Sequence, residues 1–283
     1  MYMPELPEVE TITRNLNINL VGQKLLSIDF LRKDIIAEKL NPVSEYLLLG
    51  ESIIKVFRYG KYLLFQFTNN YLMIVHLRMT GKLLYLPLLS EEDKNLYLNH
   101  KHTHVIFNFS DGELLFNDVR RFGKIYFSKI DNSVTLEELL NSGPDALSEN
   151  FSKDYLYQRS QKSPKKAIKT FLLDQKIVAG IGNIYADECL FLAAIKPNRA
   201  AASLTREESS TLHDKIIQVL EDSILSGGTT FSDYRTADNH KGNFQNKLFV
   251  YGRAGESCRI CSNTLESIKI AGRTTVYCPK CQI

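Results

Sequence analysis

Four cysteines near the C-terminus have the spacing of a zinc site. Cys258-x2-Cys261 and Cys278-x2-Cys281 are separated by 16 residues. Two such pairs can bring four thiolates into a tetrahedron, with the residues between them folded as a hairpin. Two disulfides or a redox pair are the alternatives, and the N-terminal sequence, which shows no secretory-signal pattern, favours zinc. We therefore expect one structural Zn²⁺, which would hold together a segment too short for a core of its own.

The fifth cysteine and one arginine of the predicted hairpin also allow predictions. Cys189 lies alone in an apolar run and is expected to be a small buried hydrophobic side chain. Gly272 and Arg273 lie near the middle of the predicted hairpin. A guanidinium at the hairpin tip would suit the geometry of a phosphate, although an ordinary exposed arginine fits the pattern as well.

The segment Pro4–Glu10 suggests nucleophilic chemistry. We expect translation to start at Met3, and removal of that methionine would leave Pro4 as a free secondary amine. An α-amino group has a pKa of about 7.7–8, against about 10.4 for lysine, so a sizeable fraction is unprotonated near neutral pH. Such an amine can attack a sugar C1′ and form an iminium, and Glu5 could shuttle the protons. If Met1 is the true start, the Pro4 nitrogen is an amide and this chemistry is lost.

The N-terminal half of the chain is expected to carry one helix and a set of strands. Val9, Ile12, Leu16 and Leu20 recur at helical spacing within residues 5–20, and Gly22 suits the helix end. Seven short segments rich in β-branched and aromatic residues follow, with hairpin turns at Asn69-Asn70 and Asp111-Gly112. They are residues 53–57, 62–67, 71–77, 82–86, 105–109, 113–116 and 124–127. This pattern predicts an antiparallel sandwich or barrel.

Beyond residue 135 the pattern becomes helical. Helices are expected over 135–142, 152–160, 165–178, 184–193 and 205–226, with a capping box from Thr205 to Glu208 and Gly227-Gly228 after the last helix. Residues 143–150 are expected to be a linker. The predicted domains are an N-terminal catalytic domain over 1–134, a helical domain over 135–231, a mobile loop over 232–247 and a zinc hairpin over 248–283.

Composition and charge narrow the functional classes. The chain has 283 residues, of which 44% are hydrophobic, which excludes a disordered protein. No run of 18 apolar residues occurs, so we expect no membrane partner and a cytoplasmic location. Residues 151–283 carry 19 Lys and Arg against 13 Asp and Glu, whereas residues 1–150 carry 16 against 19. The second half is therefore expected to face a polyanion, or to present a solvated basic face.

Nine short motifs, in this order, resemble the bacterial formamidopyrimidine-DNA glycosylase family over essentially the whole chain. Each is weak alone, and their shared order and spacing make the resemblance specific. They are PELPEVE at 4–10, YGKYL at 59–63, HLRMTG at 76–81, KHTH at 101–104, RRFG at 120–123, GIGNIYADE at 180–188, GGTT at 227–230, VYGRAGESC at 250–258 and the cysteine module.

The resemblance implies an α+β fold, with an N-terminal antiparallel β-sandwich, a helix–two-turns–helix domain and a zinc hairpin. It also implies a monomeric base-excision repair enzyme, a DNA glycosylase and abasic-site lyase, that acts on oxidised purines in duplex DNA by β,δ-elimination. In catalysis, it implies Pro4 as the nucleophile, Glu5 as the general acid/base, and Lys61 and Arg273 as residues that assist elimination. The residues implied to fill the void left by a flipped nucleotide are Met79, Arg120 and Phe122. Contacts to the DNA backbone are implied for His102, Arg120, Lys165 and Asn183, and a contact to the lesion for Glu8.

The residues themselves agree with parts of this assignment. Asn183 precedes a predicted helix and suits an N-cap whose free amides could hold a phosphate. Met79 and Phe122 follow strands beside Gly81 and Gly123, where exposed tips or core positions are both possible. His102 and His104 lie one strand step apart, which suits a backbone contact or satisfied surface histidines better than a metal pair.

Two departures and three alternatives remain. The basic run at residues 162–166 carries an extra residue, so the assignment of Lys165 is open, and Asp118-Val119 stands where relatives commonly have Asp-Pro. The alternatives are a sister glycosylase for oxidised pyrimidines, a damaged-DNA-binding protein without catalysis, and a zinc-ribbon protein that binds RNA.

Overall fold

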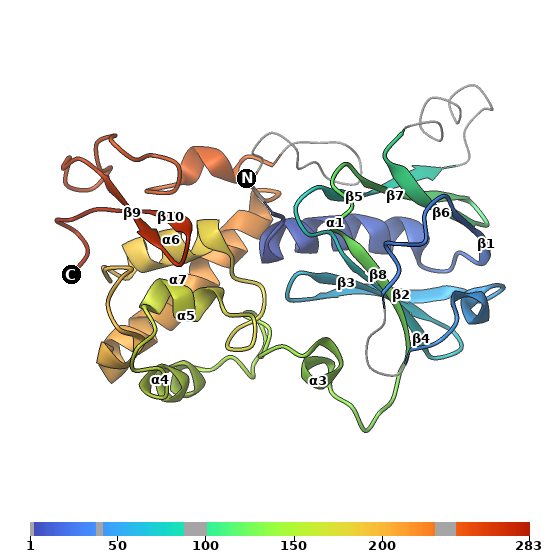
Figure 1. Cartoon of the computed structure of the whole chain (residues 1–283), viewed down its shortest axis with the longest axis horizontal. Helices are drawn as coiled ribbons and strands as arrows, with labels where there is room; N and C mark the ends of the chain where they lie inside the picture. The colour runs from blue at the N-terminus through green and yellow to red at the C-terminus, as the bar shows by residue number, and fades with distance from the viewer. Residues whose placement is uncertain (1–2, 38–41, 88–100, 230–241) are drawn as a thin grey trace. The chain divides into compact units, whose positions relative to one another are not determined.

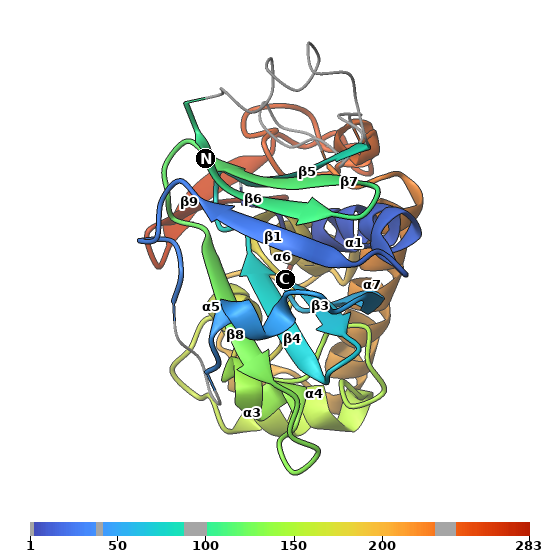
Figure 2. The same cartoon turned by 90° about the vertical axis from the view of Figure 1, so that its right-hand side faces the viewer.

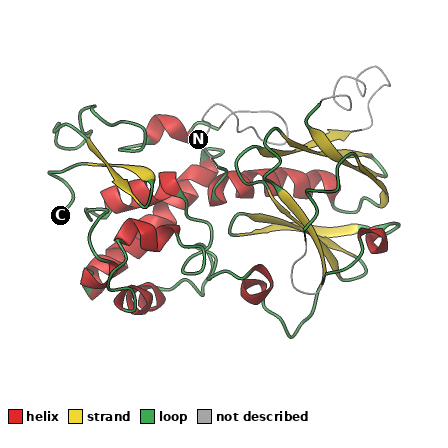
Figure 3. Cartoon of the chain, in the orientation of Figure 1, coloured by secondary structure: helices red, strands yellow, loops and turns green. Residues whose placement is uncertain are grey.

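The structure is a computed structural model that describes residues 3–37, 42–87, 101–229 and 242–283. The chain forms two compact units. The first contains residues 1–140 and 227–242, and the second contains residues 141–226 and 243–283. Strands dominate the first unit, while the second consists of helices and one hairpin (Figure 3). No helix in the described ranges has the length and apolar character needed to cross a membrane.

The first unit is a sandwich of two antiparallel four-stranded sheets (Figure 1, Figure 2). One sheet has the order β1-β6-β7-β5, and the other has the order β2-β3-β4-β8. The strands are β1 (Leu25–Phe30), β2 (Ile53–Tyr59), β3 (Tyr62–Phe67), β4 (Tyr71–His76), β5 (Gly81–Pro87), β6 (Thr103–Phe109), β7 (Gly112–Asp118) and β8 (Lys124–Lys129). The helical elements are α1 (Leu6–Leu20), η1 (Glu45–Leu48) and α3 (Leu136–Leu140).

One hydrophobic core joins α1 to both sheets. Val9, Ile12, Leu16 and Leu20 of α1 are buried in it with residues of both sheets. The helical spacing of these four residues is confirmed, and it places the N-terminal segment against the sandwich. The seven predicted strands are also confirmed, and Tyr62–Phe67 has the predicted bounds. Strand β1 was not among them, because its outward positions are exposed and give little hydrophobic pattern.

The second unit contains four α-helices, two short 3₁₀ helices and a two-stranded hairpin in its described part. They are α4 (Lys153–Gln161), α5 (Ile168–Leu173), α6 (Asn183–Leu192), η2 (Ala201–Ser203), α7 (Arg206–Leu225), η3 (Phe244–Lys247), β9 (Glu266–Ile270) and β10 (Arg273–Tyr277). The capping box predicted at Thr205 and Glu208 is present at the start of α7. Cys189 is fully buried, as predicted.

Three expectations differ from the structure. The helix predicted over 165–178 is limited to α5, because Asp174 ends it and Gln175 turns its side chain to the backbone of Gly180 and Ile181. The linker predicted over 143–150 lies inside the second unit, where the backbone of Ala146 pairs with that of Ala179. Most of the predicted mobile loop, residues 232–241, lies outside the described residues, and η3 occupies part of the remainder.

Candidate functional site

The start of α1 holds Pro4 and Glu5 in the interior of the first unit. Glu5 is the N-cap residue and is only 3% exposed, and Pro4 beside it is also buried. Glu5 and Glu8 form a capping box, in which the Glu5 backbone N–H donates to Glu8 Oε2 at 2.9 Å. A carboxylate in the first helical turn is favoured by the unpaired N–H groups there. The backbone around Pro4 is therefore fixed by the helix that follows it.

Glu8 connects this helix start to the GGTT motif. Its side chain is fully buried, and Oε1 accepts from the Thr229 backbone N–H at 2.7 Å. The two carboxylate oxygens thus bind two backbone segments that are 221 residues apart in the sequence. This gives Glu8 a role in positioning Glu5, while its contact with a lesion stays a prediction. The sequence offered no signal for the bond to Thr229.

Lys61 and His102 lie at turns of the sandwich. Lys61 occupies the tight turn between β2 and β3 and is 5% exposed. His102 is half-buried just before β6, and its carbonyl accepts from the Asp118 N–H at 2.9 Å. His104 is buried and not at the surface as predicted, and its Nε2 lies 2.7 Å from the Asp118 carbonyl oxygen, which satisfies this ring nitrogen.

Met79, Arg120 and Phe122 come together from two different turns. Met79 lies between β4 and β5, and the other two lie between β7 and β8. The Arg120 guanidinium carbon is 4.5 Å from the centre of the Phe122 ring, and Nη1 is 3.6 Å from Met79 Sδ. Phe122 is 48% exposed, and Met79 and Arg120 are half-buried. We call these three residues the wedge cluster. Phe122 is thus an exposed tip and Met79 a half-buried one, and neither is a core residue.

Asn183 is not the N-cap that the sequence predicts. Gly182 occupies that position in an extended conformation, and Asn183 is the first residue of α6. The Asn183 side chain turns instead to β10, where Nδ2 donates to the Thr274 carbonyl at 3.3 Å. Its Oδ1 has no hydrogen-bond partner in the described part of the chain. Lys165 lies exposed in the turn before α5.

The second half of the GIGNIYADE motif holds the C-terminal segments in place. Glu188 is buried, and its carboxylate accepts from the N–H groups of Phe249, Val250 and Tyr251 at 2.7–2.9 Å. Burial raises the pKa of Glu188, and these three hydrogen bonds oppose the shift. Burial also raises the pKa of the neighbouring Asp187 to about 7, although the Lys169 ammonium favours its charged form.

The four predicted zinc ligands form one cluster. The Sγ atoms of Cys258, Cys261, Cys278 and Cys281 all lie within 4.8 Å of one another, with 3.9 Å between Cys258 and Cys281. Thiolates about 2.3 Å from one tetrahedral Zn²⁺ would lie about 3.8 Å apart, so the cluster fits this ion. Without a metal, a hydrogen bond from the Asn263 N–H lowers the pKa of Cys261 to about 7, whereas burial raises the pKa of Cys278 and of Cys281.

Arg273 lies at the tip of the hairpin that the cysteines enclose. It is the first residue of β10, pairs with Ile270 and is exposed. Ala271 and Gly272 form the two-residue turn, and both have positive φ angles, of 47° and 75°. Arg273 therefore lies at the hairpin tip, as predicted.

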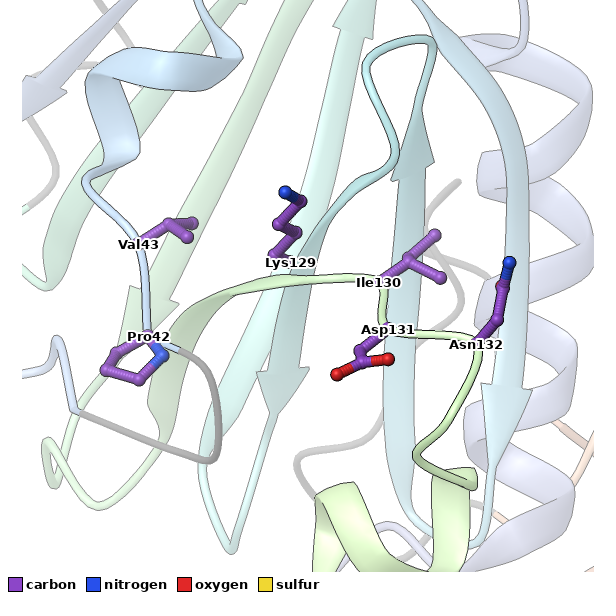
Figure 4. A pocket seen from close by; sticks show the side chains of 6 residues that line it. All are labelled: Pro42, Val43, Lys129, Ile130, Asp131 and Asn132. Atoms are coloured by element: carbon purple, nitrogen blue, oxygen red, sulfur yellow. The ribbon is translucent and has the colours of Figure 1, made fainter.

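A separate surface hollow lies in the first unit, lined by Pro42, Val43 and residues 129–132 (Figure 4). The side chains of Lys129 and Asp131 point in different directions in it. None of these lining residues is among the predicted site residues, so the hollow is not part of the candidate site.

Comparison with known proteins gives three matches to family models along the chain. The formamidopyrimidine-DNA glycosylase N-terminal domain matches residues 3–125, the H2TH domain of the same enzymes matches residues 142–235, and a zinc finger found in FPG and IleRS matches residues 255–283. The zinc finger match agrees with the fit of the cysteine cluster to one structural Zn²⁺.

Full-length relatives agree with these matches. A formamidopyrimidine-DNA glycosylase of Desulfitobacterium hafniense strain DCB-2 is 43% identical over 99% of this chain and 100% of its own length. The MutM (Fpg) crystal structure from Thermus thermophilus is 36% identical, with a TM-score of 0.85 and coverage of 99% of this chain and 98% of that one. Lactococcus lactis Fpg in complex with abasic-site DNA is 38% identical, with a TM-score of 0.84 and 99% of both chains covered. The chain belongs to the formamidopyrimidine-DNA glycosylase family.

Proposed function

We propose that this protein excises oxidised purines, 8-oxoguanine and formamidopyrimidines, from duplex DNA and then cleaves the strand at the resulting site. The observation that carries the proposal is the wedge cluster, in which a thioether, a planar cation and an aromatic ring from two turns meet at the surface. Such groups can stack into the hole that a flipped-out nucleotide leaves in a duplex. Solved complexes of the Lactococcus lactis relative contain Fapy-dG or abasic-site DNA.

The reaction would begin at the N-terminus of the mature chain. With Pro4 as its first residue, the amine attacks C1′ of the flipped nucleotide, and the bond from C1′ to the base breaks as the base takes up a proton. Glu5 then protonates the ring oxygen O4′, the C1′–O4′ bond breaks, and the amine nitrogen becomes part of an iminium. The neighbouring Glu8 holds the Glu5 backbone through this sequence.

The iminium makes strand cleavage possible because it acidifies the adjacent carbon. Loss of a proton from C2′ expels the 3′ phosphate, and loss of a proton from C4′ then expels the 5′ phosphate, which leaves a one-nucleotide gap. We assign Lys61 to phosphate binding and to the first elimination, and Arg273 to phosphate binding and to the second. Both cations favour the phosphate as a leaving group.

DNA binding would rest mainly on phosphate contacts from His102, Arg120, Lys165 and Asn183, with Glu8 near the lesion. The Asn183 side-chain NH₂ donates one hydrogen to Thr274 and has a second to offer to a phosphate at the start of α6, and the basic second half of the chain provides the favourable field. Binding should therefore weaken as salt is added. We place the protein in the bacterial cytoplasm at the nucleoid, acting as a monomer.

Borohydride trapping tests the proposed reaction. A chain beginning at Pro4 should form a covalent adduct with a duplex that contains 8-oxoguanine opposite cytosine, because the reduced iminium links protein and sugar. Pro4→Gly should abolish base excision and largely keep DNA binding. The chain that retains Met1-Tyr2-Met3 should form no adduct.

The same assay separates the alternatives. Absence of an adduct from the Pro4 chain, with binding to the lesion duplex retained, would leave only a damaged-DNA-binding protein. Faster cleavage of a thymine glycol duplex than of the 8-oxoguanine duplex would assign the chain to the sister glycosylases for oxidised pyrimidines. Preferential competition by RNA would favour an RNA-binding protein.

A further inference from the structure

A single buried carboxylate connects the two turns that carry the wedge cluster. Asp118 is the last residue of β7 and is fully buried. Its Oδ1 accepts hydrogen bonds from the Thr80 hydroxyl and from the Arg120 N–H, the latter at 3.1 Å. Its Oδ2 accepts from the Gly123 N–H at 2.7 Å. Thr80 directly follows Met79, so the carboxylate binds both turns at once.

The Thr80 hydroxyl strengthens this connection. It also accepts from the Arg120 N–H, at 3.1 Å, while its own proton goes to Asp118. The residue after Met79 and the first wedge residue of the other turn are therefore joined directly as well as through the carboxylate. Hydrogen bonds to an ionised acceptor are stronger than those between neutral groups, so this network is suited to fixing backbone geometry.

The two turns need such support because of their conformations. Arg78, before Met79, has a φ angle of 54°, and Arg121, between Arg120 and Phe122, has a φ angle of 59°. The left-handed region is unfavourable for a non-glycine residue, so it persists only where surrounding contacts determine it. The Arg78 N–H donates to His76 Nδ1 at 3.0 Å, which supports the first turn from the strand before it.

Close packing around the carboxylate leaves no room for a side chain at Gly123. A Cβ atom there would lie 2.6 Å from Phe116 Cζ and 3.1 Å from Asp118 Oδ2. The position of Gly123 is thus set by the same group that binds its N–H.

The backbone of Asp118 is anchored in turn to residues at the start of β6. Its N–H donates to the His102 carbonyl at 2.9 Å, and its own carbonyl lies 2.7 Å from His104 Nε2. The carboxylate therefore belongs to the rigid sheet and not to either turn. A group fixed in the sheet can hold two otherwise separate turns in one relative position.

We propose that Asp118 is a positioning residue that presets Met79, Arg120 and Phe122 as one wedge before DNA is bound. The proposal rests on the void-filling role given to these residues above. Extruding a nucleotide breaks its stacking and base pairing, and a wedge that is already ordered loses less entropy when it enters the duplex. Asp118 would therefore favour extrusion without touching the DNA.

The Asp118→Asn substitution tests this role while keeping the side chain's shape. Three donors converge on the two oxygens, and an amide offers one acceptor and one NH₂ group, so at least one turn loses its hydrogen bond. We expect excision of 8-oxoguanine from a fully paired duplex to fall by about ten- to a hundredfold, as misplaced catalytic groups do. Cleavage of an abasic site in single-stranded DNA, which leaves no void to fill, should stay within about twofold of wild type.

The matched control is Asp111→Asn, in the turn at the opposite end of β7. This variant should behave as wild type on both substrates. If Asp118→Asn does not fold, Thr80→Val removes the donor to Oδ1, and Thr80→Ser restores it. Thr80→Val should then lower excision of 8-oxoguanine from the paired duplex, and Thr80→Ser should restore it.

A fluorescence measurement separates this proposal from the proposed activity. 2-Aminopurine placed opposite the lesion reports unstacking when the wedge enters. The signal should appear with wild type and be reduced with Asp118→Asn at saturating protein. An equal signal, or a parallel loss on both cleavage substrates, would overturn the role of Asp118. A wild-type protein that gives the signal but neither cuts the DNA nor is trapped on it would overturn the proposed activity. The positioning role of Asp118 would then still be tested by the fluorescence of wild type against Asp118→Asn.

Discussion

The Lys169 ammonium lies 2.6 Å from the Asp187 carboxylate, and neither side chain is exposed at all. Lys169 belongs to α5 and Asp187 to α6. The ammonium also donates to Thr275 Oγ1 at 2.8 Å, and the carboxylate accepts from the Val276 N–H at 3.2 Å. This ion pair thus fastens two helices to β10, the strand that starts with Arg273.

Breaking the pair should strongly destabilise the second unit. Lys169→Met would leave the Asp187 carboxyl buried without its partner, and removal of one member of such a pair costs about 3–5 kcal/mol. Denaturant unfolding measures this loss. Lys166→Met is the control, because Lys166 pairs with Asp174 at a partly exposed site, where the expected loss is about 0–1 kcal/mol. Equal losses in the two variants would contradict a structural role for the buried pair.

Zinc removal should affect the hairpin and its arginine together. Cys278→Ser should lower the bound zinc from about one ion per chain to nearly none, because the site loses one of the four thiolate ligands that complete the tetrahedral coordination. Without the metal, the hairpin that presents Arg273 should become disordered and DNA binding should weaken. Metal analysis and DNA titration measure the two effects. Cys189→Ala, which lies outside the cluster, should keep the zinc, and full zinc in Cys278→Ser would refute the four-thiolate site.

Local sequence patterns predicted most of the fold because helical periodicity, helix capping and turn formation depend on residues close together in the sequence. The four apolar residues of α1 and the Thr205–Glu208 capping box act within a few residues of one another. The aromatic segment at 62–67, followed by the turn at Asn69-Asn70, gave β3 its bounds. The cysteine spacing and the position of Arg273 follow from hairpin geometry in the same way.

The groups that were missed depend on partners far away in the chain. Lys169 and Asp187 resemble ordinary charged residues of helical faces, and only the tertiary structure shows that both are buried. Asp118 is one acidic residue at a strand end, and its partner Thr80 is 38 residues away. Asn183 was misassigned because its side chain prefers a bond to β10 over capping its own helix. Rules based on local residue spacing cannot predict these long-range contacts.

The wedge cluster should depend on the flat shape of Arg120 as well as on its charge. Arg120→Lys keeps the cation but loses the planar group that stacks on Phe122 and reaches Met79. We expect excision from a paired 8-oxoguanine duplex to fall by about tenfold while affinity for undamaged DNA changes little. Single-turnover kinetics and DNA titration measure these quantities. Arg32→Lys, at an exposed ion pair of the same unit, should change neither, and an unchanged excision rate in Arg120→Lys would exclude a stacking role.

Acid should weaken the second unit partly through Glu208. Two hydrogen bonds from Arg199, at 2.7 and 3.0 Å, hold the pKa of Glu208 below 4.5. The folded state therefore binds this proton less tightly than the unfolded state, so the stabilisation is present above pH 4.5 and is lost as the pH falls through the folded-state value. Because the pair is partly exposed, its contribution should be about 1 kcal/mol or less.

Glu208→Gln isolates this contribution, since the amide keeps an acceptor for the Thr205 N–H and does not titrate. The free energy of unfolding of wild type should exceed that of the variant near pH 6, and the difference should shrink as the pH falls from about 5 to 3. Glu221→Gln, at an exposed position of the same helix, should follow the wild-type curve. A difference between wild type and Glu208→Gln that stays constant over this range would show that titration of the Glu208 carboxylate does not contribute to the acid sensitivity of this unit.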